Sequence, residues 1–351
     1  MPKRLRYTLM VVLGLIALAA GWRLTAPTPS PVPAPTRHSY SQALEQAHNG
    51  QPGAARVLYQ QLDRTDLSAA QRVKLYAELP NYPSPRALKL ATADAQQGDV
   101  MVRRAAIAAI IGLVSGAQRS IVLGPLLEDE NPTIRHAVAS ALLALTPDEL
   151  GLYFAPLETV LDDYVQTLEE QPDEPDAQLQ LARIYLHDAD FQQADRAVNR
   201  ALANAPDDAA AVATQLDILE RQGKPEQARQ ILAEQLQRYP ESADLQAELG
   251  DWLRDHDQDE YALLALAKAV ELAPDDTSHR YKLAVALHDL EQVEAAQKQL
   301  EEILRRDPAN REARVLLIDY WKETGQLQNV QVLLAELEQQ NADDPALQQG
   351  L

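Results

Sequence analysis

Small and apolar residues recur along the second half of the chain with a period of 34 residues. Prolines mark this period at five positions: Pro172, Pro206, Pro240, Pro274 and Pro308. In windows counted from Pro175, the eighth and twentieth positions mostly hold small residues, and the twenty-fourth holds Val or Leu. Small residues at fixed places let two antiparallel helices approach closely, and larger aliphatic side chains fill the remaining space. The pattern predicts helical hairpins at 175–208, 209–242, 243–276, 277–310 and 311–344.

The ends of the expected helices carry matching signals. Side chains that can cap a helix N-terminus occupy the last position of the first four windows: Asp208, Ser242, Asp276 and Asn310. Between the two helices of a window, Gly223-Lys224-Pro225 and Gly325-Gln326 have the composition of turns. Each window is therefore expected to hold two helices and one tight turn.

These windows resemble the tetratricopeptide repeat. In the first window the matching residues are Leu181, Ala182, Tyr185, Ala194, Ala201 and Pro206. In the third they are Leu249, Gly250, Ala262, Ala269 and Pro274. The second and fifth windows depart from the pattern, with Leu216 and Ile318 at the small position and Val330 in place of alanine. The resemblance covers about half of the chain and implies an all-α solenoid, in which each hairpin buries its apolar face against its neighbours.

A degenerate copy lies near the N-terminus. The sequence from Gly50 to Arg56 parallels the one from Gly223 to Arg229, which predicts a helical hairpin at 38–63 within a segment that extends to residue 83.

Residues 84–146 follow another period. The pair Val102-Arg103 recurs as Ile134-Arg135, 32 residues later. The segment from Asp129 to Arg135 resembles the link between the helices of HEAT repeats. In that family an Asp and an Arg bond along the stack, and Asp129 and Arg135 match these two residues. The first copy has Gln97 where the Asp would be. The expected helices are 85–96, 100–114, 118–128 and 132–145, followed by a connecting helix at 157–169 within 147–174.

HEAT-like hairpins followed by tetratricopeptide repeats are similar to the C-terminal portion of some bacterial multihaem c-type cytochromes. The chain has no cysteine and therefore no site for covalent haem attachment. The similarity implies at most a related scaffold that serves envelope redox or assembly proteins in trans.

The N-terminus has the features of a membrane anchor or a signal peptide. Three basic residues precede an uncharged run at 7–22, which would form a helix of roughly 24 Å. We expect an uncleaved inner-membrane anchor at 1–24; the alternative is a signal peptide cleaved after a small-x-small site at 17–19, which leaves a soluble periplasmic protein. Both alternatives place the rest of the chain in the periplasm. Alternating prolines at 25–37 predict an extended spacer.

The net charge of the chain indicates which classes of binding partner to expect. The chain has 52 acidic and 32 basic side chains, a net charge of -20. Residues 175–344 hold 34 acidic and 17 basic side chains, a net of -17. Strong acidity argues against nucleic acid, whose phosphates bind Lys and Arg, and favours basic or neutral protein partners.

No motif in the sequence predicts catalysis, a cofactor or a metal. None of the seven histidines has another histidine four residues away, and phosphate-binding glycine loops and the Gly-x-Ser-x-Gly motif are absent. Alternating carboxylates from Asp255 to Glu260 could bind Ca²⁺, but Glu260 and Leu266 occupy positions that need Gly and Glu. A solvated turn is expected there, and ion binding is left open.

The tetratricopeptide resemblance implies a concave face formed by the first helix of each hairpin. The candidate partner-binding residues on this face are Arg183, His187, Asp217, Arg221, Asp251, Arg254, Tyr281, His288, Asp319 and Lys322. We therefore expect a non-enzymatic scaffold of the bacterial envelope that binds peptides or proteins on this face. The alternative is an assembly factor or chaperone for envelope c-type cytochromes or another envelope complex. Residues 345–351 are expected to form a tail.

Overall fold

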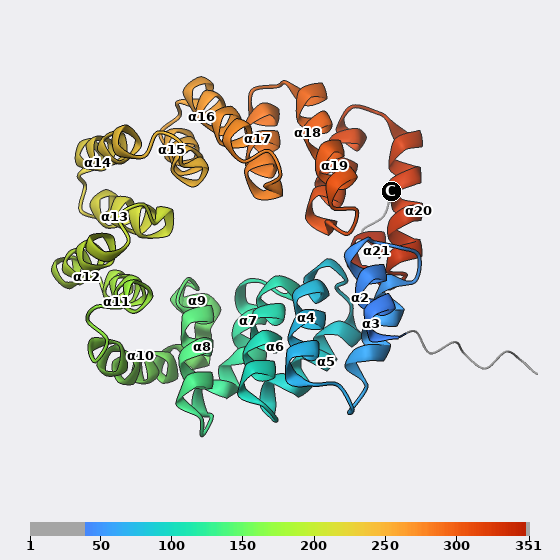
Figure 1. The fold of residues 1–351 in the computed structure, drawn as a ribbon, viewed down its shortest axis with the longest axis horizontal. Helices are drawn as coiled ribbons and strands as arrows, with labels where there is room; N and C mark the ends of the chain where they lie inside the picture. The colour runs from blue at the N-terminus through green and yellow to red at the C-terminus, as the bar shows by residue number, and fades with distance from the viewer. Residues whose placement is uncertain (1–38, 349–351) are drawn as a thin grey trace, which may run out of the picture. The chain divides into compact units, whose positions relative to one another are not determined.

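The described part of the protein is all-helical, as predicted. A computed structural model describes residues 39–348, which belong to one compact body that begins at Tyr40. Helices account for all the regular secondary structure in these residues (Figure 1). The expected anchor and the Pro-rich spacer lie outside the described residues. Between residues 39 and 348, no helix combines the length and the apolar character needed to cross a bilayer.

The five 34-residue windows each contain two antiparallel helices, of 13 and 14 residues. The pairs are α11 (Pro175–His187) and α12 (Phe191–Asn204), α13 (Ala209–Arg221) and α14 (Pro225–Arg238), α15 (Ala243–Asp255) and α16 (Asp259–Leu272), α17 (Thr277–Asp289) and α18 (Val293–Arg306), and α19 (Arg311–Glu323) and α20 (Leu327–Gln340). A short helix, α21 (Pro345–Gln348), follows. In Figure 1 the first helix of each pair lies on the inner side of the array.

The predicted caps and contacts explain these bounds. The Asp208 carboxylate accepts a hydrogen bond from the backbone N–H of Ala210 at 2.9 Å, and the other three predicted caps also accept backbone hydrogen bonds. Gly250 is needed where α15 meets α16, because a Cβ there would lie 2.5 Å from Cγ of Leu266. The larger Leu216 and Ile318 at the same repeat position are nevertheless buried.

The first half of the body consists of helical hairpins of less regular length. Its helices are α2 (Tyr40–His48), α3 (Ala54–Leu62), α4 (Ala69–Glu78), η1 (Leu79–Asn81), α5 (Pro85–Gln96), α6 (Val100–Leu113), α7 (Gly116–Leu123), η2 (Gly124–Glu128), α8 (Pro132–Leu142), α9 (Pro147–Leu150), η3 (Gly151–Tyr153) and α10 (Phe154–Glu169). The expectation of one α-helix at 118–128 was wrong. The helix tightens into a 3-10 turn at Gly124, because Pro125 has no N–H to donate.

Arginine–aspartate pairs join consecutive hairpins in this half. Arg103 on α6 pairs with Asp129 before α8, and its Nε also donates to the carbonyl of Ala95 at 2.9 Å. Arg135 on α8 pairs with Asp163 on α10 at 3.1 Å. The pairs therefore run along the stack and use both of the residues singled out in the sequence. Membership of the HEAT family stays a prediction.

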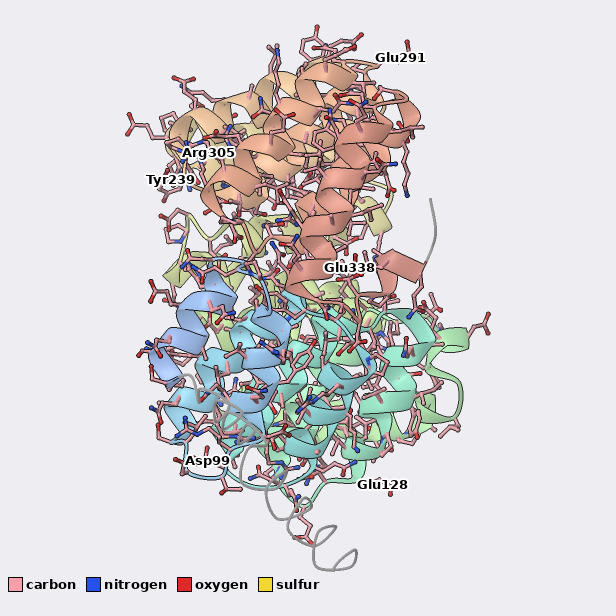
Figure 2. The ribbon with its side chains drawn as sticks, turned by 90° about the vertical axis from the view of Figure 1, so that its right-hand side faces the viewer. Asp99, Glu128, Tyr239, Glu291, Arg305 and Glu338 are labelled. Atoms are coloured by element: carbon pink, nitrogen blue, oxygen red, sulfur yellow. The ribbon has the colours of Figure 1, made fainter. Side chains whose placement is uncertain are left out.

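The C-terminal helices of the body contact its N-terminal helices. The backbone N–H of Gly53 donates to the carbonyl of Gln339 at 2.7 Å, and the buried Asn341 amide donates to the carbonyl of Pro83 at 2.7 Å. Figure 1 places α20 and α21 beside α2 and α3, and Figure 2 faces this side, with Glu338 of α20 labelled.

Gly50 tightens this junction, and a buried ion pair holds the C-terminal window itself together. Gly50 has φ +58°, and a Cβ on it would lie 2.5 Å from the carbonyl oxygen of Pro308. The fully buried Asp344 carboxylate accepts two hydrogen bonds from Arg311, both at 2.7 Å. The helices of residues 40–348 thus form a closed circuit, which the sequence did not predict.

Candidate functional site

A large cavity of the described body lies where the two kinds of hairpin meet. It has a volume of about 1220 Å³ and opens on the inner side of α11 and α13. Apolar side chains from the turn between α8 and α9, together with Phe154 at the start of α10, form one wall. The charged and histidine side chains that line it are Glu158, Arg183, His187, Asp188, Asp217, Arg221 and Glu248. We refer to this cavity as the groove.

Four of the ten candidate partner-binding residues line the groove: Arg183, His187, Asp217 and Arg221. Asp217 and Arg221 form an ion pair of 3.1 Å along α13. Arg183 is exposed, and alone among the ten it has no hydrogen bond or ion pair with another residue of the described chain. Its guanidinium is therefore available to a partner.

Two other candidates are held in ion pairs between consecutive inner helices. Asp251 on α15 pairs with Lys282 on α17 at 2.5 Å, and Arg254 pairs with Asp289 at 2.7 Å. These residues do not line the groove, and their charges hold α15 and α17 together.

The remaining candidates lie further along the array. His288 pairs with Glu323 on α19 at 2.7 Å and stacks on the ring of Tyr320. Burial, reinforced by the Glu312 carboxylate, raises the pKa of Tyr281 to about 12, so its hydroxyl stays protonated at neutral pH. Asp319 lies 3.6 Å from Lys322.

Sequence reasoning missed several residues of the groove, among them Glu158, Asp188, Phe154 and Glu248. Phe154 keeps 39% of its surface exposed although it is a large apolar residue. Glu248 on α15 is partly buried, and burial followed by the charges of Asp251 and Asp244 raises its pKa, against the lowering effect of Lys282. It forms no ion pair or side-chain hydrogen bond with another described residue. Glu248 occupies the sixth position of its window, next to the expected inner-face positions rather than on them, which is why the repeat register overlooked it.

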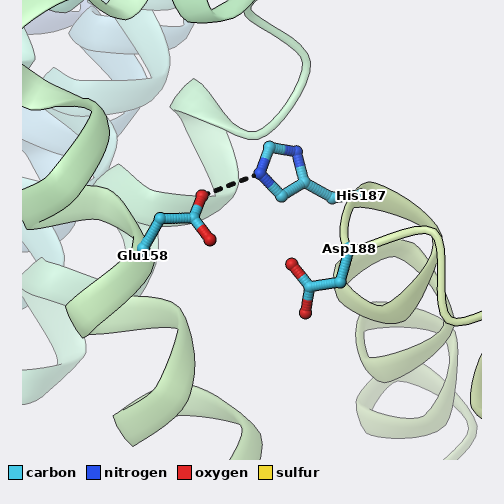
Figure 3. Close-up of side chains that lie close together, drawn as sticks. All are labelled: Glu158, His187 and Asp188. Atoms are coloured by element: carbon cyan, nitrogen blue, oxygen red, sulfur yellow. Dashed lines mark hydrogen bonds and ion pairs between the residues drawn. The ribbon is translucent and has the colours of Figure 1, made fainter.

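Three potential metal ligands meet at the wall of the groove (Figure 3). Nε2 of His187, at the end of α11, lies 3.0 Å from Oε1 of Glu158 on α10. The carboxylate of Asp188 approaches the same space, and the three potential ligand atoms lie within 4.8 Å of one another. Burial and the nearby Glu158 carboxylate raise the pKa of Asp188.

The other candidate ion site remains a turn. Asp255 ends α15 and Asp259 begins α16, and the turn between them does not bring together three such ligands within the described residues. The helical register predicted from the sequence is therefore confirmed at this point.

The stacked hairpins define a helical repeat protein. Two family models of the tetratricopeptide repeat match residues 159–216 and 256–333. These two segments of the chain therefore carry tetratricopeptide repeats, and the resemblance noted in the sequence is confirmed for them. The first match begins within α10, so the family pattern starts one helix earlier than the expected boundary at 175.

Comparisons with whole proteins add fold similarities. A search of curated proteins gives no match. YrrB, described as a TPR protein with an unusual peptide-binding site, is 18% identical, with 54% of this chain and 97% of that chain covered and a TM-score of 0.37. Yeast Tom70 is 12% identical, with coverage of 85% and 76% and a TM-score of 0.45. PilW, a type IV pilus biogenesis factor, is 18% identical, with coverage of 63% and 98% and a TM-score of 0.42.

Proposed function

We propose that the protein is a non-enzymatic scaffold whose groove binds a segment of a partner protein that carries basic and apolar side chains. Tetratricopeptide arrays are protein-interaction scaffolds, and proteins built from them are typically not enzymes. The groove lies on the inner helices, where the repeat architecture presents side chains to a partner.

The composition of the groove is the observation that carries this proposal. Its volume of about 1220 Å³ exceeds the roughly 300–1,000 Å³ of ordinary small-molecule pockets. Phe154 and Leu186 offer apolar surface for aliphatic side chains. Glu248 offers a desolvated carboxylate without an ion-pair partner, which a Lys or Arg side chain would satisfy.

The charge of the array supports the same partner. The excess of acidic side chains over residues 175–344, a net of -17, attracts basic segments and raises their association rate at low salt. Arg183 adds a single unpaired cation at the groove, which suits an acidic side chain or a carbonyl group within an otherwise basic segment.

We further propose that the protein works in the periplasm, anchored in the inner membrane by residues 1–24. The support is the sequence pattern of three basic residues followed by the uncharged run at 7–22. Mass spectrometry of the N-terminal peptide of the protein from a membrane fraction tests the anchor. A peptide that begins after residue 19 would contradict it.

Fluorescence anisotropy tests the binding proposal. The full chain is titrated against labelled 12-residue peptides that alternate Leu with Lys, and against matched peptides with Glu in place of Lys. We expect the Lys peptide to bind at least tenfold more tightly at low salt. Glu248→Gln should weaken its binding at least tenfold, because a charge-assisted hydrogen bond of about 1.5–3 kcal/mol is lost.

Glu260→Gln on α16 is the matched control. It removes the same charge from an exposed position outside the groove, and we expect less than a twofold effect. Equal binding of both peptides, or equal effects of the two substitutions, would contradict the proposed use of the groove.

A further inference from the structure

We propose that Glu158, His187 and Asp188 form a binding site for a divalent transition-metal ion of the Zn²⁺ type at the wall of the groove. The three residues come from α10 and from the end of α11, two helices that pack against each other. Figure 3 shows the three side chains directed toward a common space.

The distances suit such an ion. Zn²⁺ binds imidazole nitrogen and carboxylate oxygen at about 2.0–2.2 Å, so neighbouring ligands of a tetrahedral site lie roughly 3.3 Å apart. His187 Nε2 and Glu158 Oε1 are 3.0 Å apart, close to that spacing. The Asp188 carboxylate lies within 4.8 Å of both, so a side-chain rotation that moves its oxygen by up to about 1.5 Å brings it into the coordination sphere.

The donor set selects the class of metal. Imidazole nitrogen suits Zn²⁺, Cu²⁺, Ni²⁺ and Fe²⁺, whereas Ca²⁺ and Mg²⁺ prefer oxygen ligands alone. Three protein ligands leave one tetrahedral position open. Since all three residues line the groove, the open position faces the groove, where water or a side chain of the partner can occupy it.

Electrostatics favour a cation at this place. The carboxylates of Glu158 and Asp188 both lie near the imidazole of His187. The charges of Asp162 and Asp190 add to the local negative potential at Asp188. A divalent cation compensates for this excess of negative charge and links the Asp188 carboxylate to the ligands on both helices. The pair of His288 and Glu323 elsewhere in the array has a similar His–carboxylate contact without a third ligand.

Metal binding would fasten the first 34-residue hairpin to the helix that precedes it. Glu158 lies on α10, and His187 and Asp188 lie at the C-terminal end of α11. The ion therefore fixes the spacing of the two helices that form adjacent walls of the groove. The test of the metal site does not depend on the proposed peptide ligand, because Zn²⁺ binding is measured without any peptide.

Calorimetric titration of the full chain, purified in detergent micelles, with ZnCl₂ tests the site. We expect one ion per chain, a rise in melting temperature with Zn²⁺, and no comparable effect of CaCl₂ or MgCl₂. His187→Gln and Asp188→Asn should each weaken Zn²⁺ binding at least tenfold and remove the thermal shift. His288→Gln is the matched control, because it breaks another His–carboxylate pair and leaves the three ligands intact.

Circular dichroism of each variant shows whether its helix content is retained. If His187→Gln lowers the helix content, Glu158→Gln replaces it as the second ligand test. Zn²⁺ affinity that is equal in the native chain and in the ligand variants, or several weak ions that His288→Gln affects equally, would mean an adventitious ion only. Either result overturns the proposal. Weak peptide binding with intact Zn²⁺ binding would contradict only the proposed function.

Discussion

At the scale of single residues, arginine–aspartate pairs join the hairpins of the N-terminal half. Asp129 is the clearest case, because Arg103 pairs with it and both side chains are largely buried. Burial alone would raise the pKa of Asp129. The hydrogen bonds from Arg103 and from the backbone N–H of Asn131 outweigh burial, so the pKa is lowered overall.

Asp129→Asn should therefore destabilise the protein by about 3 kcal/mol at pH 7, because it leaves the buried Arg103 without its counter-charge. The effect depends on pH. Since the pKa of Asp129 is lower in the folded chain than in the unfolded chain, its carboxylate adds stability above the ordinary value of 3.8. This stability is lost as the pH falls through the folded pKa. Urea unfolding followed by circular dichroism at pH 7 and near pH 3 measures the difference.

Glu226→Gln provides the comparison at an exposed pair. Glu226 and Arg229 are both well exposed, and such surface pairs contribute roughly 0–1 kcal/mol. If the two substitutions cost the same at pH 7, or if the cost of Asp129→Asn does not shrink in acid, the pair between the hairpins is not structural.

At the scale of elements, the sequence predicted the tetratricopeptide helices closely because several local signals agree. Period, N-caps and turns all place the start of α13 at Ala209. Prediction was weaker between residues 116 and 128, where Ser115 makes no capping hydrogen bond at the helix start. There Gly124 and Pro125 divide one expected helix into α7 and η2.

One turn position requires a left-handed backbone conformation, which the residue types alone did not reveal. The fifteenth residue of all five windows has a left-handed backbone: Ala189 (φ 56°), Gly223 (φ 71°), Asp257 (φ 57°), Glu291 (φ 57°) and Gly325 (φ 71°). Glycine adopts this conformation freely, whereas residues with a Cβ are strained in it. Three of the five turns therefore carry a local cost that the packing of the repeats offsets.

Ala189→Gly should stabilise the protein by about 0.5–1 kcal/mol, since it removes the strain of a left-handed alanine. Gly223→Ala should destabilise it by about 1 kcal/mol for the same reason. Urea unfolding midpoints measure both changes. The control is Ala335→Gly in the exposed interior of α20, which should cost about 1 kcal/mol. A loss of stability in Ala189→Gly as large as in the control would refute this account of the turn.

At the scale of the whole body, the closed circuit and the groove could not be predicted from a repeat register. Both depend on segments far apart in the chain. Asn341 bonds to the carbonyl of Pro83, 258 residues away, and no local signal identifies that partner. Arg183 and Asp217 line the groove, whereas Asp251 and Lys282 pair with each other. The curvature and the cross-helix ion pairs decide which inner-face positions remain available.

Closure also explains how the ends of a repeat array avoid exposing apolar surface. Terminal repeats of a solenoid usually need a polar outer face. Here Ala309, just before the last window, belongs to the same buried cluster as Ala47 and Leu58 of the first hairpin. Gly50 lets these two ends approach, because a larger residue would meet the carbonyl of Pro308.

The distance between the two ends tests the central claim, that the stacked hairpins close into one circuit, most directly. Since the chain has no cysteine, spin labels attach only at Gln60→Cys on α3 and Glu338→Cys on α20. Electron spin resonance should show one narrow distance distribution, which Gly50→Ala broadens and lengthens. Gly223→Ala is the control, because that glycine also has positive φ but no atom within 4 Å of its added Cβ. A broad distribution in the native chain, or equal broadening by both substitutions, would contradict the closed circuit.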